Sequence, residues 1–453
     1  MDRQLVEHNH RRQNPEFHDI FSTIYGPVRE RRPDDPTNDV MTITFQVTED
    51  CNLNCSYCYQ ANKTKKRMSL DTAKKAIDLI LNDTQYCRSD RKGACILEFI
   101  GGEPLLEIDL IENIYRYFVE RASILNHEWL FHHRISICSN GILFNSPKVM
   151  DFLNTYGLIT SMAITIDGPK ELHDSCRKFH NGSGSHDIVE KSVHLAQTRF
   201  RLPDTKVTIS PENLKWLSTI IPYFYENFKY TDIMANCTFE GPWTISDANL
   251  FYHELKYISE YCDKNDTYEK LFISLFEEKF FTPMDYSIDD KNWCGGCGDM
   301  IAISPDGYIY PCLRYMPSSI GNLSEHMIIG HVDRGILTKS CEKCLHKELT
   351  SITATSQSTE TCIHCPVASG CAWCSAYNYE STGTVNKRVT NICIMHKARA
   401  LANCLYWNTF YLKHHVKNVH ELYLPESDAI EIIGKDEYQN LCELIQRAKE
   451  ALS

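Results

Sequence analysis

Apolar and polar side chains alternate along the first half of the chain with two different periods. Residues 41–49 alternate apolar with polar side chains and are rich in β-branched types, which is typical of a strand. Residues 69–81 begin with a capping serine and repeat apolar side chains at helical spacing. The same order returns in predicted strands at 95–100, 134–138, 161–166, 206–209 and 233–239, and in predicted helices at 108–125, 147–156, 187–200, 212–228 and 246–262. Six strand–helix units in a row predict a parallel α/β domain in the form of an open (β/α)6 partial barrel.

Beyond residue 270 this rhythm is lost. Cysteines and turns become dense up to residue 392, and clear helical spacing returns at 395–411 and 436–452. The pattern therefore divides the chain into a polar extension at 1–40, a barrel at 41–270, a cysteine-rich domain at 285–395 and a C-terminal helical region at 396–453.

Composition narrows the class of protein. The 453 residues suffice for two or three domains with sizeable cores. A net charge of −12 argues against a general nucleic-acid binder, because no basic surplus is available to neutralise phosphates. We expect no membrane span and no signal peptide, since the start is charged and no stretch approaches the length of an apolar transmembrane run. Without an export signal, 21 cysteines favour metal binding in a reducing cytoplasm over disulfides.

Three of these cysteines follow the first predicted strand. Cys51, Cys55 and Cys58 stand three and then two residues apart, so one short loop brings three thiols together. A [4Fe–4S] cluster takes four thiolates, and a local trio therefore leaves one iron open to a small molecule. Parallel α/β barrels place their chemistry in loops at the carboxyl ends of their strands. The alternatives are a zinc loop and buried free cysteines.

This spacing, with Tyr57 before the third cysteine, resembles the signature of radical S-adenosylmethionine (SAM) enzymes. The resemblance implies a TIM-like partial barrel in which Cys51, Cys55 and Cys58 hold a [4Fe–4S] cluster. It also implies that the open iron chelates the methionine part of SAM. Electron transfer from the cluster then cleaves the sulfonium and gives a 5′-deoxyadenosyl radical.

Polar residues follow the next three predicted strands. They are Gly101-Gly102-Glu103 after the second, Ser139 and Asn140 after the third, and Asp167 with Arg177 after the fourth. Singly, each of these residues could equally be a turn or cap residue. The resemblance assigns cofactor binding to Tyr57, Gly101, Gly102, Glu103, Ser139, Asn140, Asp167 and Arg177. Within that set Glu103 would accept from the amino group of SAM, and Arg177 would pair with a carboxylate.

The later cysteines resemble the SPASM extension of radical enzymes, which holds two auxiliary [4Fe–4S] clusters. The resemblance places one cluster on Cys294, Cys297, Cys312 and Cys374 and the other on Cys362, Cys365, Cys371 and Cys393. Cys374 departs from the family spacing, with two residues before it instead of three, so its exchange between the clusters is open. Alternatively, Cys341, Cys344, Cys362 and Cys365 have the spacing of a zinc ribbon.

Family members with this extension mostly modify peptides or proteins. The residues after the fourth strand and the segment 365–380 resemble maturases of ribosomally synthesised peptides, and we expect thioether crosslinks from cysteine sulfur to an acceptor-residue carbon. The alternatives are a carbon–carbon or ether crosslinker, a formylglycine-forming sulfatase maturase, and a non-enzymatic iron–sulfur or zinc interaction protein. Leu313 stands where the sulfatase maturases carry a catalytic aspartate, which counts against that alternative.

The resemblance also implies partners. We expect a cysteine-rich precursor peptide as substrate and a flavodoxin- or ferredoxin-type protein as reductant. About forty residues precede the first strand, too few for the winged-helix module that binds leader peptides in many maturases. Leader recognition would then lie elsewhere on the chain or on a separate leader-binding protein.

Overall fold

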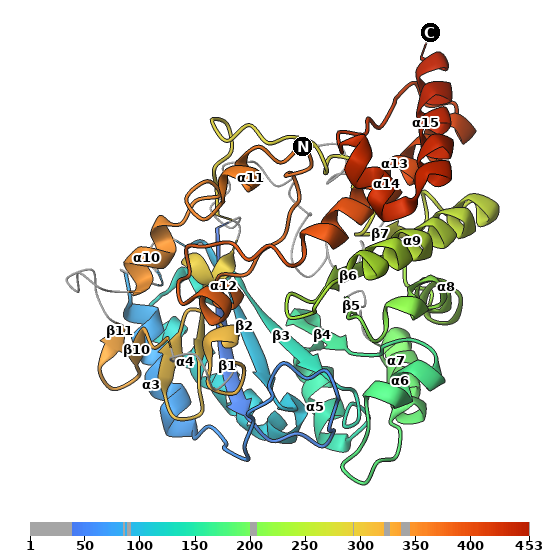
Figure 1. The fold of residues 1–453 in the computed structure, drawn as a ribbon. Helices are drawn as coiled ribbons and strands as arrows, with labels where there is room; N and C mark the ends of the chain where they lie inside the picture. Colours follow the sequence, from blue (N-terminus) through green and yellow to red (C-terminus); the bar gives the residue numbers. More distant parts are fainter. Residues whose placement is uncertain are drawn as a thin grey trace.

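The computed structural model describes residues 39–84, 87, 92–199, 206–292, 294–320, 327–336 and 345–452. Residues 1–38, together with Cys341 and Cys344, lie outside this description. The centre of the molecule is a parallel β-sheet covered by helices on its outer face (Figure 1). Further helices follow at the C-terminal end of the chain. The predicted mixed α/β architecture with a parallel, barrel-like core and C-terminal helices is therefore confirmed.

The described strands form two sheets. The larger sheet has the order β11-β10-β9-β8-β1-β2-β3-β4, and the smaller one has the order β5-β6-β7. Neighbouring strands from β1 to β4 and from β5 to β7 pair in parallel. The barrel strands are β1 (Val40–Thr48), β2 (Ala94–Gly101), β3 (His133–Ser139), β4 (Thr160–Ile164), β5 (Lys206–Ile209), β6 (Asp232–Cys237) and β7 (Phe272–Ile273). β7 is a short seventh strand that the hydrophobic pattern did not predict.

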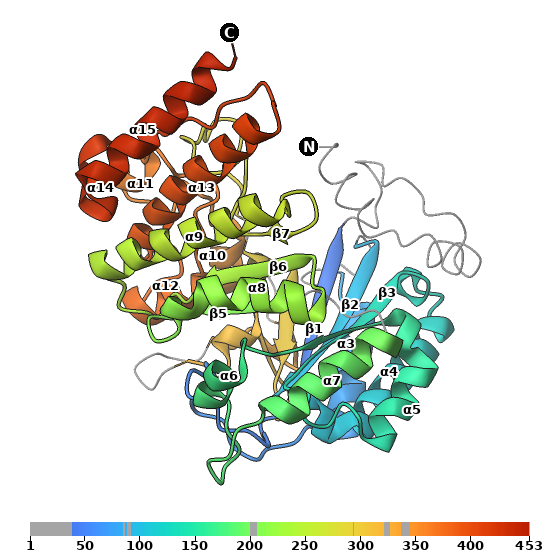
Figure 2. The ribbon, with the colours of Figure 1, turned by 90° about the vertical axis from the view of Figure 1, so that its right-hand side faces the viewer.

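The helices between these strands follow the predicted order. They are α3 (Leu70–Asn82), α4 (Ile108–Ile124), α5 (Pro147–Tyr156), α6 (Lys170–Cys176), α7 (His186–Arg199), α8 (Leu217–Phe228) and α9 (Ile245–Asn265). Figure 2 shows α3, α4, α5 and α7 along the outer side of the central strands. Ser69 caps α3 as predicted, because its side chain accepts from the backbone N–H of Thr72.

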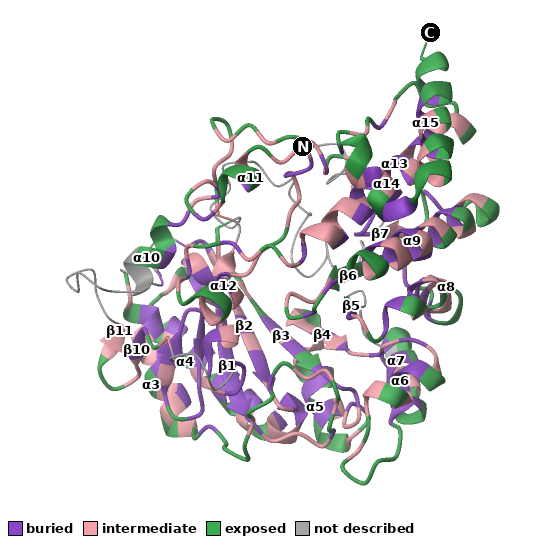
Figure 3. Cartoon of the chain, in the orientation of Figure 1, coloured by how far each residue is buried: buried purple, intermediate pink, exposed green. Residues whose placement is uncertain are grey.

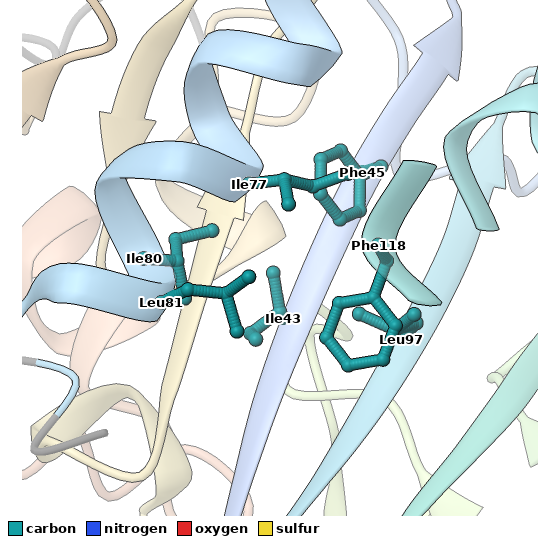
Figure 4. Close-up of a pocket in the computed structure, with 7 residues that line it drawn as sticks. All are labelled: Ile43, Phe45, Ile77, Ile80, Leu81, Leu97 and Phe118. Carbon is teal, nitrogen blue, oxygen red and sulfur yellow. The ribbon is translucent and has the colours of Figure 1, made fainter. Parts of the chain in front are cut away.

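The core lies between the sheet and these helices. Phe45 of β1 and Phe99 of β2 are fully buried, with their ring centroids 5.7 Å apart. Figure 4 shows a small gap where these strands meet α3 and α4; it is lined by Ile43, Phe45, Ile77, Ile80, Leu81, Leu97 and Phe118. Because every lining side chain is apolar, this gap belongs to the core. Figure 3 shows buried residues along the central strands and exposed residues on the outward sides of the helices.

The cysteine-rich segment extends the same sheet. Its first strand, β8 (Met300–Ile303), pairs in parallel with β1, so Thr42 lies opposite Met300. β9 (Tyr308–Tyr310), β10 (Gly330–His331) and β11 (Gly335–Ile336) continue the sheet antiparallel. The first edge of the barrel is therefore covered by a strand from about 260 residues later in the chain, which local hydrophobic spacing could not reveal.

Helices complete the C-terminal region. They are α10 (Leu345–Ser351), α11 (Glu360–Ile363), α12 (Ser375–Thr382), α13 (Cys393–Lys413), α14 (Glu426–Ile433) and α15 (Lys435–Glu450). α13 lies beside α9 (Figure 2), and the Phe276 and Tyr406 rings stack at 4.0 Å between centroids. The aromatic residues of α13 therefore pack in the core. Within the described residues, the structure has no helix with the length and hydropathy of a membrane span.

One predicted helix boundary differs from the structure, and two short helices were not predicted. The helix expected from residue 212 begins at Leu217, because Asn213 instead accepts from the backbone N–H of Ser210 and closes a turn. α6 was not predicted, since seven residues after Pro169 are too short to establish a period. α14 was also not predicted; it is an eight-residue helix that begins after Pro425.

Candidate active site

The loop that carries Cys51, Cys55 and Cys58 is held against a segment from the far side of the barrel. The backbone N–H groups of Asn54 and Ser56 donate to the carbonyls of Lys178 and Cys176 at 2.7 and 2.9 Å. Leu53 also forms a β-bridge with Phe179. The segment after α6 thus fixes the conformation of the loop, and no motif in the sequence indicated this contact.

Each of the three thiols faces a nitrogen donor from a different part of the chain. The Asn140 amide lies 3.8 Å from Cys51 Sγ, an Arg177 guanidinium nitrogen 3.9 Å from Cys55 Sγ, and Lys63 Nζ 3.5 Å from Cys58 Sγ. Two of these donors are cations. Such donors stabilise sulfur in its thiolate form. Lys63 was missed by sequence reasoning, although it lies only five residues after Cys58.

Two of the three free thiols, Cys51 and Cys55, are poor anions. Burial raises the pKa of Cys55 to about 11, and the charge of Arg177 opposes this effect only in part. Burial also raises the pKa of Cys51. A metal that binds here must therefore displace protons. Three thiols on one loop, each beside a donor, fit the demands of an anionic iron–sulfur cluster.

Gly101 and Gly102 let the end of β2 pack directly against the backbone at the start of this loop. A Cβ on Gly102 would lie 2.2 Å from the carbonyl oxygen of Asp50, and one on Gly101 would lie 2.5 Å from that of Thr48. The two glycines thus allow a close backbone approach to the chain's own carbonyl groups. Direct cofactor contact by either glycine stays a prediction.

Glu103 joins the ends of two strands. Its carboxylate is buried and accepts from the Leu105 N–H at 3.0 Å, the Asn140 N–H at 2.8 Å and the Ser139 hydroxyl at 2.8 Å. Burial raises the pKa of Glu103, and these three donors oppose that shift. A carboxylate offers about four acceptor sites, so one remains for the expected amino group. Ser139 and Asn140 support Glu103 in this arrangement.

Asp167 organises a third contact at the same end of the barrel. Its carboxylate accepts from the Tyr57 hydroxyl at 2.6 Å and from Arg177 Nε at 3.0 Å. The Arg177 guanidinium also lies 5.3 Å from the centroid of the Tyr57 ring. Burial raises the pKa of Tyr57 well above its ordinary value, so the phenol keeps its proton. The structure therefore brings these three predicted residues together beside Cys55.

A buried histidine that the sequence did not single out braces this group. His173 Nδ1 accepts from the Asp167 N–H at 3.2 Å, and its Nε2 lies 3.0 Å from the hydroxyl of Ser185. Ser185 in turn donates to the carbonyl of Arg177 at 2.9 Å. Burial lowers the pKa of His173 to about 4, so the ring is neutral. One side chain thus positions the backbones of both Asp167 and Arg177.

Comparison with protein families shows which family the sequence of this barrel end resembles. The model of the radical SAM superfamily matches residues 45–217, which contain all of the contacts described above. Residues 45–217 are thus similar to the radical SAM superfamily. This similarity points to a [4Fe–4S] cluster and SAM, for which Cys51, Cys55 and Cys58 are the candidate ligands.

Curated relatives are similar to this chain over different parts of its length. An uncharacterised protein of Methanocaldococcus jannaschii is 32% identical over 40% of this chain and 57% of its own length. The radical SAM cyclopropyl synthase TigE of Paramaledivibacter caminithermalis is 22% identical over 79% of this chain and 71% of its own. The cysteine-type anaerobic sulfatase-maturating enzyme of Clostridium novyi is 24% identical over 60% and 72%. The chain spans about half the length of the first two relatives matched, 57% and 49%.

Solved structures agree on the fold. The sulfatase-maturating enzyme anSMEcpe with bound AdoMet superimposes with a TM-score of 0.60 at 16% identity, over 83% of this chain and all of that chain. Streptococcus suis SuiB bound to its precursor peptide SuiA gives a TM-score of 0.52 at 12% identity, over 84% and 80%. The similarity thus reaches well beyond the radical SAM segment into the cysteine-rich region.

The first predicted group of later cysteines does come together in space. The Cys294 thiol shares a hydrogen bond with Cys297, which lowers the pKa of Cys294 to about 6. A Cβ on Gly296 would lie 3.7 Å from the sulfurs of both Cys294 and Cys312. Cys374 acts electrostatically on Cys312 and is itself affected by Cys294. The spacing anomaly before Cys374 therefore does not separate it from these residues.

The second predicted group also comes together. Burial raises the pKa of Cys393 to about 12, with smaller contributions from the nearby Cys371, Cys362 and Cys365 thiols. Cys371 is influenced in turn by Cys365 and Cys362. The eight late cysteines thus influence one another within the two predicted sets, while cluster ligation by either set stays a prediction.

Two further points concern metals. Cys341 and Cys344, on which the zinc-ribbon alternative depends, lie outside the described residues. Among the residues that the structure does describe, no three His, Cys, Asp or Glu side chains converge closely enough for a single metal ion.

Proposed function

We propose that this chain is a radical SAM enzyme that crosslinks a cysteine-rich, ribosomally synthesised precursor peptide through thioether bonds. The observation that carries the proposal is the loop with Cys51, Cys55 and Cys58, in which each thiol lies beside a nitrogen donor. The eight late cysteines and the similarity to enzymes with peptide or protein substrates support the substrate class.

The chain's own residues have separable tasks in this proposal. Cys51, Cys55 and Cys58 would hold the cluster, and together cluster and SAM supply a 5′-deoxyadenosyl radical that removes a carbon-bound hydrogen atom. Glu103 keeps one acceptor site at the end of β2 for the amino group of the cofactor. Arg177 offers guanidinium N–H groups to a carboxylate while Asp167 holds its orientation.

The net conversion joins sulfur to carbon with loss of two hydrogens. The acceptor carbon loses a hydrogen atom to the deoxyadenosyl radical, and the substrate thiol loses a proton to solvent. Formation of the carbon–sulfur bond then leaves one electron in excess. An auxiliary cluster held by the cysteine-rich region would accept this electron, since cluster potentials can be tuned over a wide range. An external flavodoxin- or ferredoxin-type reductant is expected to supply the first electron.

The test uses anaerobically reconstituted protein, SAM, dithionite and a cysteine-rich peptide encoded beside the gene. We expect deoxyadenosine together with a peptide that has lost two hydrogens, keeps its sulfur and no longer reacts with a thiol reagent. A product that lost two hydrogens but kept every thiol free would instead identify a carbon–carbon or ether crosslinker. Absence of deoxyadenosine from protein with a full cluster would contradict the whole proposal.

Formylglycine formation is the second candidate, because sulfatase-maturating enzymes are among the relatives. It differs in that the product loses the cysteine sulfur and gains an aldehyde. Leu313 follows Cys312, at the position where the sulfatase maturases carry a catalytic aspartate. This difference counts against formylglycine formation. A hydrazide reagent that labels the product would favour formylglycine over a thioether.

A further inference from the structure

The strands at the centre of the large sheet point alternate side chains to its two faces. Ile43, Phe45 and Leu97 point toward α3 and α4, where they line the apolar gap in Figure 4. Successive side chains of a strand point to opposite faces. Thr44 of β1 and Glu98 of β2 therefore point away from these helices, toward the inside of the barrel. The inner face of the sheet thus carries a carboxylate within β2.

A row of polar side chains crosses this inner face at the level of Glu98. In the pairing register Glu98 lies opposite Thr44 on one side and opposite Ser136 of β3 on the other. Ser136 in turn lies opposite Ser161 of β4. Bulky apolar side chains fill the interior of a closed α/β barrel. Polar side chains on four neighbouring strands therefore suit an interior that receives a polar ligand.

The inner faces of both sheets are open to solvent. On β3, Cys138 is exposed, whereas Ile137 beside it is fully buried. On β6, Met234 is 45% exposed, whereas Ile233 is fully buried. In both strands the buried neighbour belongs to the core that the surrounding helices share. Because the side chains on the opposite, inner faces are exposed, a ligand can reach Glu98 from the inside of the barrel.

The carboxylate of Glu98 has acceptor sites to spare. It is half-buried and accepts from the Thr44 hydroxyl at 2.6 Å. A carboxylate offers about four acceptor sites. Across the described ranges of the chain, no lysine, arginine or histidine forms an ion pair with Glu98, and this includes Arg134, which shares its face of the sheet. A negative charge inside the barrel thus has no positive partner from the described residues.

The other two carboxylates of this barrel end already have their partners. Glu103 accepts from three donors, and Asp167 pairs with Arg177 at 3.0 Å. Glu98 lies three residues before Gly101 on the same strand, which is roughly 10 Å at the rise of a β-strand. Glu98 therefore faces the space beneath the expected SAM site, where a substrate side chain would lie.

We propose that Glu98 binds a lysine or arginine side chain of the precursor peptide inside the barrel, and that this ion pair sets which neighbouring residue of the peptide meets the 5′-deoxyadenosyl radical. The inference rests on the proposed function, which supplies the peptide and the radical. A cationic side chain satisfies the free acceptor sites with charge-assisted hydrogen bonds and supplies the missing positive charge. The half-buried position of Glu98 strengthens this attraction relative to an ion pair on the surface.

The experiment uses the full chain, reconstituted anaerobically, with the precursor peptide encoded beside the gene. Glu98→Gln is nearly isosteric and keeps an acceptor for the Thr44 hydroxyl but removes the charge. Glu120→Gln, at an exposed position of α4, is the matched control. On the peptide side, each lysine or arginine is replaced in turn by methionine. Iron content and SAM binding are measured first, and KM and kcat for peptide modification are then determined for every pair of enzyme and peptide.

We expect Glu98→Gln to raise the KM for the peptide by roughly 10- to 100-fold, because hydrogen bonds to a charged group are lost. In the wild type, one methionine-substituted peptide should raise KM by a similar factor. That peptide should suffer little further increase with Glu98→Gln, since both changes remove the same contact. Tandem mass spectrometry should also find the modification spread over neighbouring residues in Glu98→Gln. Glu120→Gln should behave as the wild type with every peptide.

The inference is overturned if Glu98→Gln keeps the wild-type KM. It is equally overturned if no single lysine or arginine replacement raises KM in the wild type, a result that does not depend on the folding of any variant. A lower kcat at unchanged KM, with an altered pH dependence, would make Glu98 a proton acceptor for the substrate thiol instead of a binding residue.

The identity of the product is an independent result. A carbon–carbon crosslink with the expected changes in KM would refute thioether formation and leave the role of Glu98 intact. A thioether product with unchanged KM values would refute the role of Glu98 alone. If no product forms, the Kd of the labelled peptide, measured by fluorescence anisotropy, replaces KM in the same comparison.

Discussion

The two cysteine-bearing regions of the molecule are built in opposite ways. The barrel-end trio lies on one loop of eight residues, so its members meet through local chain geometry. The late groups draw on positions from 294 to 393, carried by different turns and helices. Local spacing therefore carries most of the information about the first region. In the second region, the fold must first bring distant segments together.

The two regions also differ in the groups that surround their cysteine sulfurs. Every thiol of the trio has its own donor, from Asn140, Arg177 or Lys63. In the second late group, burial is the main cause that raises the pKa of Cys371 and Cys393. Each sulfur of the trio thus has its own nitrogen donor, whereas burial dominates the environment of these two late thiols.

The largest expected effect follows from replacing Cys51, Cys55 and Cys58 together by alanine. This variant should lose about four iron per chain and form no deoxyadenosine from SAM under strong reductant. Iron analysis and chromatography of the products measure both losses. Cys442→Ala, on the half-buried face of α15, is the control and should keep all of the iron. Deoxyadenosine at wild-type rates in the triple variant would remove the trio from the chemistry.

Glycine-to-alanine substitutions test how tightly the backbone is packed in the two regions. Gly102→Ala places a Cβ 2.2 Å from a backbone oxygen of the cysteine loop, where no side-chain movement can relieve the clash. We expect a loss of about 3 kcal/mol in the free energy of unfolding, measured by urea denaturation. Gly295→Ala, beside Cys294, meets only the flexible Met300 side chain at 3.3 Å and should cost less than about 1 kcal/mol. Equal losses in the two variants would contradict the contrast.

The sequence predicted the barrel better than its surroundings. Strands such as β1 and helices such as α5 have unbroken periods, and their positions agree with the structure within one residue. β8 could not be predicted as a neighbour of β1, because parallel pairing across about 260 residues leaves no local pattern. The motifs indicated Asp167 and Arg177 but not His173 or Lys63. The last two could not be predicted because they act through contacts that form only in the folded chain.

Asp167 offers a test of intermediate size. Asp167→Asn removes the charge that orients Arg177 and accepts from Tyr57. Hydrogen bonds to charged groups contribute about 1.5–3 kcal/mol, so we expect the Kd for SAM to rise by roughly 10- to 100-fold on the reconstituted protein. Isothermal titration calorimetry measures the change. Asp187→Asn, whose exposed carboxylate pairs with Lys170, is the control and should bind SAM normally. If Asp167→Asn binds SAM with the wild-type Kd, the hydrogen bonds of Asp167 with Arg177 and Tyr57 stabilise the fold but do not contribute to SAM binding.

The smallest expected effect is a dependence of stability on pH at the brace behind Asp167. Burial lowers the pKa of His173 to about 4, whereas the same side chain in the unfolded protein titrates near 6.5. Below pH 6.5 the unfolded chain therefore gains a proton that the folded chain does not. The stability from this residue is present above pH 6.5 and is lost as the pH falls toward 4.

Between pH 6.5 and 5.5 this loss should be about 1 kcal/mol in the free energy of unfolding, measured by urea denaturation. His173→Asn keeps an acceptor near the position of Nδ1 but cannot titrate, so its stability should fall by less over the same interval. His396 of the C-terminal region, also buried with a pKa of about 4, contributes the same slope in both proteins and cancels in their difference. An identical pH dependence in the two proteins would mean that His173 is not the neutral brace of the barrel end.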